Sequence, residues 1–139
     1  MVASYQIESN DAVVRLPDIP PIDVGAPLPQ VYAAEHELLE LSYYVAKPEG
    51  AERDRIAVVN FSRPQAHFLG PPNEDDLQFH PLHPRGLDWY AGQEVQGSSW
   101  IRRLSLDSQQ FRHFIFTFHD STFECIAENY EIEVKDAES

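Results

Sequence analysis

Five side chains in the second half of the sequence are of types that bind divalent metal ions: His80, His83, His119, Asp120 and Glu124. Imidazole and carboxylate groups suit Zn, Mn and Fe(II), and two histidines with one carboxylate can hold an ion while one position stays open for catalysis. The His-x-x-His spacing of His80 and His83 can bring two rings to one ion, although Pro81 and Pro84 exclude the regular helix that usually presents such pairs. These residue types predict a small metal-dependent enzyme that uses His80, His119 and a nearby carboxylate, with a divalent metal as its cofactor.

The same residues also have simpler interpretations. Their spacing matches no recognised metal-binding signature, and the sequence contains no glycine-rich phosphate loop. Asp120 is most simply a turn residue. Ser121 beside His119 and Asp120 supplies the residue types of a nucleophilic triad, but neighbours on a tight turn point apart and triads are assembled from distant segments. No catalytic residue and no residue for an organic cofactor can therefore be assigned from the sequence.

Arginine and aromatic side chains form a second set of candidates, for binding a ligand. The set comprises Arg63, Arg85 and Trp89, with Arg102, Arg103, Tyr90 and Trp100 as further members. Arginines on an acidic protein can receive a carboxylate or phosphate group. The alternative is that they pair with the surplus Asp and Glu residues, and that the aromatic residues are half-buried parts of the core.

The charge of the chain excludes some classes of partner. The 139 residues include 10 Lys and Arg against 23 Asp and Glu, which gives a net charge of −13. Such a charge repels phosphate backbones and anionic membranes, so we expect neither nucleic acid nor a membrane as partner. A hydrophobic fraction of 42% argues for a packed domain rather than a disordered chain.

Cysteine usage and the N-terminus favour a cytoplasmic protein. Cys125 is the single cysteine, so no intramolecular disulfide can form, and we expect it to be a small buried core residue. The first residues lack the charged and apolar regions of a signal peptide, and no apolar run reaches membrane-spanning length.

The clearest structural pattern predicts a three-stranded antiparallel meander at 111–134. With tight turns at 120–121 and 128–129, nine apolar residues fall on one face: Phe114, Phe116, Phe118, Phe123, Cys125, Ala127, Tyr130, Ile132 and Val134. This register pairs Phe116 with Cys125. On the other, mostly polar face it places Ile115 opposite Ile126.

The rest of the chain predicts an α+β fold that is predominantly antiparallel β, arranged as a sheet, a sandwich or a partial barrel. The expected elements are a hairpin of strands at 38–46 and 55–61, short strands at 66–69 and 87–95, and one helix near 99–106 that Ser98 or Ser99 caps. Whether 31–41 is helix or strand is left open, with an irregular or helical lead-in to about 37 before the strand at 38–46. Residues 70–86 form a long irregular loop because prolines break any regular ladder there.

Three segments are expected along the chain. Residues 1–30 form an arm and a Pro-rich connector, at 17–29, that packs on the domain; residues 31–134 form one β-rich domain; and residues 135–139 form a frayed tail. Within the arm, 2–7 and 12–16 are each an edge strand or a loose piece. The role of the prolines is left open between packing on the domain and binding an aromatic groove.

Six phrases together resemble a family of uncharacterised bacterial proteins of similar size, over about residues 31–134. They are Gly-Pro-Pro-Asn-Glu at 70–74, His-Pro-Leu at 80–82, Gly-Leu at 86–87, Glu-Val at 94–95, Ser-Trp-Ile at 99–101 and Phe-His-Asp-Ser-Thr-Phe-Glu at 118–124. The resemblance implies a bacterial, stand-alone domain. It implies no activity, cofactor or site residue.

A soluble, acidic binding or interaction domain without catalytic activity is the favoured functional interpretation, and the metal-dependent enzyme is the alternative. Ile115 and Ile126 are apolar residues on a face that is otherwise polar. We expect another element or a second subunit to cover them, which makes a homo-oligomer or a protein partner the expected use of this face. The sequence names no small-molecule ligand.

Overall fold

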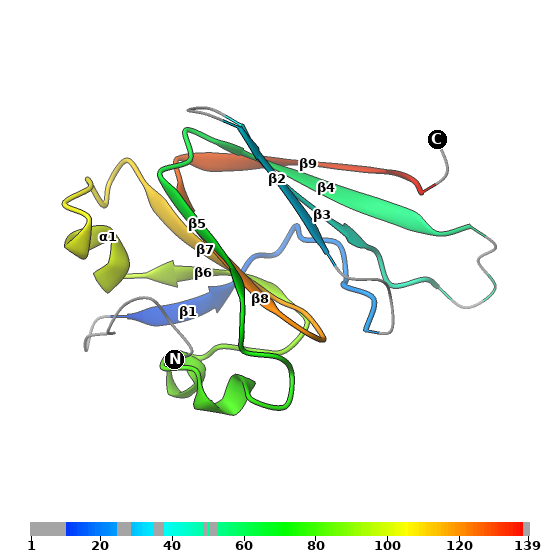
Figure 1. The fold of residues 1–139 in the computed structure, drawn as a ribbon, viewed down its shortest axis with the longest axis horizontal. Coiled ribbons are helices and arrows are strands. Elements are labelled where there is room, and N and C mark those ends of the chain that lie inside the picture. The colour runs from blue at the N-terminus through cyan, green and yellow to red at the C-terminus, as the bar shows by residue number, and fades with distance from the viewer. Residues whose placement is uncertain (1–10, 25–28, 35–37, 49, 51–52, 138–139) are drawn as a thin grey trace.

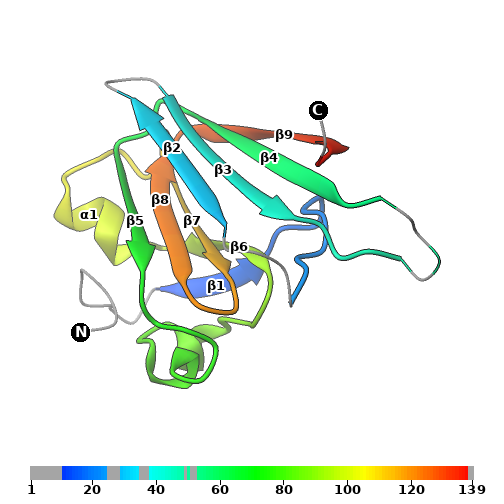
Figure 2. The same cartoon turned by 45° about the vertical axis from the view of Figure 1, so that its right-hand side comes forward.

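The chain folds into two antiparallel sheets that pack face to face, with crossing strand directions (Figures 1 and 2). The computed structural model describes residues 11–24, 29–34, 38–48, 50 and 53–137. The first sheet has the order β1 (Ala12–Arg15), β6 (Gly92–Gln96), β7 (Arg112–Thr117), β8 (Thr122–Ala127) and β5 (Ala66–Gly70). The second has the order β2 (Gln30–Ala34), β3 (Leu38–Tyr44), β4 (Arg55–Ser62) and β9 (Asn129–Asp136).

The predicted fold class is confirmed: the described residues are mostly antiparallel β, in two sheets that do not close into a barrel. The helical elements are one short helix, α1 (Ser99–Arg103), and two 3₁₀ turns, η1 (Leu77–Phe79) and η2 (His83–Arg85). Helix α1 is shorter than predicted. The Ser98 hydroxyl caps it by accepting a hydrogen bond from the Ile101 amide at 3.2 Å, and Asp11 Oδ1 accepts one from the Ser99 amide at 2.7 Å.

Strands β7 and β8 form the predicted hairpin, but their register differs from the prediction by two residues. Phe116 lies opposite Phe123 rather than Cys125. The turn is longer than predicted, because the Phe118 amide donates to the Ser121 carbonyl at 2.9 Å. A shift of two residues keeps every side chain on its face, so the apolar alternation was satisfied by either register.

The third strand of the expected meander belongs to the other sheet, which corrects its predicted pairing with β8. Strand β9 lies beside β4, with Ile132 opposite Val59, and the chain crosses between the sheets at Glu128. The inner faces of both sheets point into one core. A strand that crosses to the facing sheet therefore shows the same apolar alternation as a strand that turns back.

Aromatic side chains from both sheets fill the core between them. The ring of Phe61 on β4 lies 5.5 Å from that of Phe114 on β7 and 5.8 Å from that of Phe123 on β8. Cys125 is fully buried in this core, as predicted, and burial raises the pKa of its thiol well above the ordinary value. A buried protonated thiol is a packing residue rather than a nucleophile.

A second core lies on the opposite face of the first sheet, the mostly polar face on which the sequence predicted that another element or a second subunit covers Ile115 and Ile126. Ile115 and Ile126 are fully buried there. The chain itself covers them, with apolar residues from η1, from the loop that follows it and from α1: Leu77, Leu82, Leu87, Trp100 and Ile101. The expected partner surface at the two isoleucines is thus occupied by the same chain, and the predicted opposition of Ile115 and Ile126 is replaced by the pairs Ile115–Glu124 and Ile126–His113.

The N-terminal segment contributes to both sheets. Strand β1 is an edge strand beside β6, and Ile22 of the connector is buried and forms a bridge with Val45. The Tyr43 hydroxyl donates to the Pro20 carbonyl at 2.7 Å. Residues 31–34 are extended, whereas 35–37 and the expected piece at 2–7 lie outside the described residues. Strand β6 begins later than predicted, at Gly92, and β9 continues to Asp136.

Gly86 permits a close approach between the loop and β1, so we expect Gly86→Ala to destabilise the protein by about 2 kcal/mol. Its φ is +108°, and an added Cβ would lie 2.8 Å from the Val13 carbonyl oxygen. Gly50 is the matched control, because its φ of +84° carries similar strain while nothing lies within 4 Å of an added Cβ. Urea unfolding should show a clearly smaller loss for Gly50→Ala. Equal losses would contradict the close approach.

Candidate functional site

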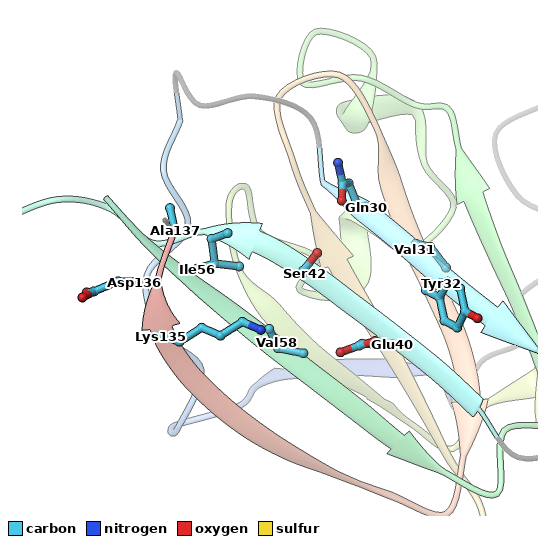
Figure 3. Close-up of a pocket in the computed structure, with 10 residues that line it drawn as sticks. All are labelled: Gln30, Val31, Tyr32, Glu40, Ser42, Ile56, Val58, Lys135, Asp136 and Ala137. Atoms are coloured by element: carbon cyan, nitrogen blue, oxygen red, sulfur yellow. The ribbon is translucent and has the colours of Figure 1, made fainter. Parts of the chain in front are cut away.

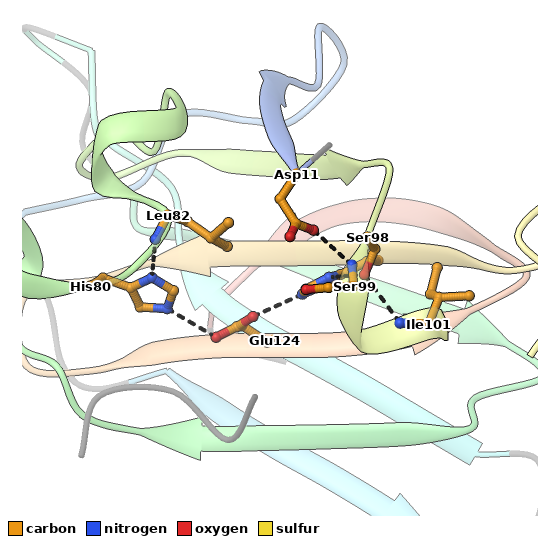
Figure 4. Close-up of polar contacts among 8 residues, drawn as sticks. Asp11, His80, Leu82, Ser98, Ser99, Ile101 and Glu124 are labelled. Carbon is orange, nitrogen blue, oxygen red and sulfur yellow. Dashed lines mark hydrogen bonds and ion pairs between the residues drawn. The ribbon is translucent and has the colours of Figure 1, made fainter. Parts of the chain in front are cut away.

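The predicted metal candidates His80 and Glu124 do lie together, but in the second core rather than at an open site. The carboxylate of Glu124 sits between two imidazoles, with Oε2 at 3.2 Å from His80 Nε2 and Oε1 at 2.8 Å from His113 Nε2 (Figure 4). His113 Nδ1 lies 2.8 Å from the Ser98 hydroxyl. The His80 and His113 side chains are 0% exposed and that of Glu124 is 3% exposed. We call this set the buried histidine network.

The hydrogen-bond partners define which nitrogens carry protons. The Leu82 amide donates to His80 Nδ1 at 3.0 Å, so the ring proton of His80 is on Nε2 and points at Glu124. The Ser98 oxygen already accepts the Ile101 amide, which leaves its hydroxyl proton for His113 Nδ1 and places the His113 proton on Nε2. Glu124 therefore accepts one N–H from each ring.

These contacts keep Glu124 ionised. Burial alone would raise its pKa, but the hydrogen bonds from His113 and His80 outweigh burial and lower the pKa to about 2. Both nitrogens of both rings are engaged within the protein, and no buried side-chain nitrogen or oxygen of the described residues lacks a hydrogen-bond partner. The network is thus a satisfied structural element.

The remaining metal candidates do not join His80. His83 packs edge-on against Trp89, with ring centroids 5.3 Å apart. Within the described ranges, no three His, Cys, Asp or Glu side chains are arranged to hold a metal ion. His113, which completes the network, was not among the candidates that the sequence indicated.

His119 and Asp120 belong to a separate surface cluster, because the loop at 70–86 reaches the β7–β8 turn. Glu74 Oε1 lies 3.0 Å from His119 Nδ1, and the Glu74 amide donates to the His119 carbonyl at 2.8 Å. The Tyr90 hydroxyl also donates to Glu74, and Asp120 Oδ1 lies 3.7 Å from His119 Nε2. The imidazole is half exposed and bracketed by carboxylates, so the cluster fastens the loop to the hairpin turn.

The arginine and tryptophan candidates are not brought together. Arg63 Nε lies 3.7 Å from Glu128, and Arg85 donates to the Asp11 carbonyl at 3.4 Å. Trp89 Nε1 donates to the Glu74 carbonyl at 2.9 Å. Each side chain has a partner within the protein, in agreement with the alternative interpretation that these residues support the fold.

A groove of about 600 Å³ lies over the outer face of the second sheet (Figure 3). We call it the outer-sheet groove and define it by Tyr32, Glu40, Ser42, Ile56, Val58 and Lys135. Alternate residues of β3 and β4 point into the core, which turns these side chains outward. Lys135 extends along the face from β9 toward Val58. In Figures 1 and 2 no described helix or strand lies on this outer side of the second sheet.

A second groove, of about 360 Å³, opens between the two sheets beside β2. Its lining includes Ala33 and Ala34 of β2, Leu38 and Leu39 of β3, and Pro64 before β5. We call it the inter-sheet groove. Among the described strands β2 pairs with β3 alone, so it is the edge of its sheet. The free edge of β2 therefore lies between the outer-sheet groove, which mixes polar and apolar groups, and the inter-sheet groove, which Gln65 and His67 also line.

The outer face also holds carboxylates. Glu40, Glu131 and Glu133 point to this face, together with Lys135, and none of the three carboxylates forms an ion pair with another described residue. Arg112, by contrast, pairs with Glu94 at 2.7 Å. The sequence did carry one signal of this groove. Strand β4 has apolar residues on both of its faces, which is typical of a strand covered on both sides.

No family model, curated protein or solved structure matches this chain. The resemblance to a bacterial family thus stays an expectation, and any functional conclusion rests on the geometry. None of the helices in the described ranges has the length and apolar character needed to cross a membrane.

Proposed function

We propose that this chain is a binding domain without catalytic activity and that its partner occupies the outer-sheet groove. The supporting observation is an uncovered groove with an apolar floor, Ile56 and Val58, beside the polar groups of Glu40, Ser42 and Lys135. Apolar contact area with a few placed polar groups is typical of ligand and partner sites. Tyr32 at the rim is 61% exposed and supplies an aromatic anchor of the kind that interfaces favour.

The alternative, a metal-dependent enzyme that uses His80, His119 and a carboxylate, has no comparable support among the described residues. His80 is fully buried and gives both nitrogens to Leu82 and Glu124, while His119 contacts Glu74 at the surface. The polar candidates for catalysis are thus divided between an internal network and a loop contact. The outer-sheet groove, in contrast, is left uncovered by the described helices and strands.

We expect small organic probe molecules, titrated into the isotope-labelled protein, to shift the backbone NMR signals of β2, β3, β4 and β9 around the groove. Replacing the exposed anchor by Tyr32→Ala should weaken binding of the best probe by about tenfold. Phe79→Ala is the matched control, because Phe79 is 66% exposed in η1, away from the groove-lining strands. Shifts that gather instead around Glu74 and His119, or equal effects of the two variants, would contradict the proposal.

A further inference from the structure

We infer that the partner is a basic, extended protein segment that adds to the second sheet as a new strand beside β2. This inference rests on the proposed binding function and names the chemistry of the partner. Three features of the structure support it: the character of the β2 edge, the grooves on both sides of that edge, and the charge of the outer face.

The edge of β2 lacks the devices that usually protect edge strands. A free edge presents unpaired backbone N–H and C=O groups, and proteins commonly guard it with charge or proline. The five residues of β2, Gln-Val-Tyr-Ala-Ala, include neither. At the opposite edge of the same sheet, β9 carries Glu131, Glu133 and Lys135. Strand addition is therefore favoured at β2.

The two grooves match the alternation of an added strand. Successive side chains of a strand point to opposite faces, so every second side chain of a partner would lie over the outer face, beside Tyr32 and Glu40. The intervening side chains would point toward the inter-sheet groove, lined by Ala33, Leu38 and Leu39. Backbone hydrogen bonds would supply affinity and the alternate side chains specificity. The two faces of the fitting segment therefore meet different neighbours: Tyr32 and Glu40 on the outer side, and small apolar side chains fit beside Ala33 and Leu39 on the inner side.

The charge of the outer face selects the polar residues of the partner. Glu40 lies on β3 next to β2, opposite Tyr32, and forms no ion pair with another described residue; the whole chain carries −13. Glu131 and Glu133 lie on β9, at the far edge of the sheet, and are out of contact range of a strand added beside β2. Lysine or arginine side chains from an added strand would meet Tyr32 first, where cation–π contact is available, and Glu40 behind it. A basic segment therefore fits this edge in two ways, through contact with the Tyr32 ring and through attraction to the acidic protein.

A second copy of this chain fits the same edge poorly. Pairing of β2 with β2 would set two acidic outer faces side by side, and like charges at an interface are unfavourable. The occupant that agrees with both the free edge and the charge is therefore a basic segment of another protein.

The test uses a synthetic peptide of about ten residues in which lysine and valine alternate, titrated into the labelled protein. We expect NMR shifts in β2 and β3. A peptide N-methylated at alternate residues, which cannot form one row of backbone hydrogen bonds, should bind at least about tenfold more weakly. Glu40→Gln, which removes the carboxylate next to β2, should also weaken binding by about tenfold, whereas the charge-matched control Glu133→Gln, on the same face at the far edge of the sheet, should have little effect.

Equal binding of the N-methylated peptide, or equal losses in Glu40→Gln and Glu133→Gln, would overturn the inference, because binding would then be unspecific charge attraction. Self-association through β2 in sedimentation experiments would overturn it in favour of a second copy. If organic probes bind the outer-sheet groove while the lysine-valine peptide does not bind, the partner chemistry is overturned and the proposed function stands. If neither binds, both are overturned.

Discussion

Replacing Glu124 with alanine should destabilise the protein by about 3–5 kcal/mol, because it leaves two buried donors without an acceptor and a cavity in the second core. The substitution leaves the Nε2–H groups of His80 and His113 without an acceptor in a site where the rings are 0% exposed. Each unsatisfied buried donor costs free energy, and the missing side chain adds a cavity. Urea unfolding followed by circular dichroism measures the change.

Glu124→Gln is the control for that result, and we expect it to cost less than alanine. The amide oxygen can still accept the proton of His80, whose tautomer is held by the Leu82 amide. The amide nitrogen can donate to His113 if that ring moves its proton to Nδ1, facing the Ser98 oxygen. If alanine and glutamine variants were both as stable as the wild type, the buried histidine network would not hold this face of the sheet together.

Acid should remove the contribution of Glu124 at a pH well below the usual range for a carboxylate. Its pKa in the folded protein is lowered from 4.5 to about 2, because the hydrogen bonds from His113 and His80 outweigh burial. A lowered pKa means that the stabilisation is complete above about pH 4.5 and is lost as the pH falls toward 2. The difference between the two values corresponds to about 3 kcal/mol.

Unfolding of the wild type and of Glu124→Gln across this pH window isolates the effect from the other carboxylates. We expect the stability advantage of the wild type to shrink by about 3 kcal/mol as the pH falls from 5 to 2, and to be constant above pH 5. An advantage that stayed constant down to pH 2, or grew, would show that Glu124 is not held ionised by its two histidines.

The sequence predicted which face of a strand each side chain lies on more correctly than it predicted which strands pair and in which register. The alternation from Phe114 to Ile132 correctly placed these side chains toward one core, because period-two burial is local information. It could not separate two registers that differ by two residues, nor a strand that turns back from one that crosses to the facing sheet. Those choices depend on long-range contacts such as Ile132 with Val59, which the local pattern does not contain.

The second core shows a different limit. Ile115 and Ile126 were correctly expected to need a cover, but the cover comes from a Pro-rich loop with no regular period. Its isolated leucines, Leu77, Leu82 and Leu87, were the available signal. The same packing of the loop onto the sheet brought His80 to Glu124, forty-four residues later in the chain, and left His119 at the surface.

The outer-sheet groove was beyond sequence reasoning because its lining comes from four strands. Tyr32, Glu40, Val58 and Lys135 become neighbours only through the order β2–β3–β4–β9. The apolar residues on both faces of β4 indicate only that this strand is covered on both sides; the outward polar residues are ordinarily solvated and do not mark a site in any single strand. The free edge of β2 likewise follows from the sheet order.

Hydrogen exchange of the β2 backbone amides, with and without the lysine-valine peptide, tests the central claim most directly. If a partner adds as a strand at this edge, the outward-facing amides of β2 should exchange at least about tenfold more slowly in the complex. Amides of β9, at the other edge of the sheet, should keep their rates. Unchanged exchange in β2 at saturating peptide, or slowing that appears at β9 instead, would contradict the account.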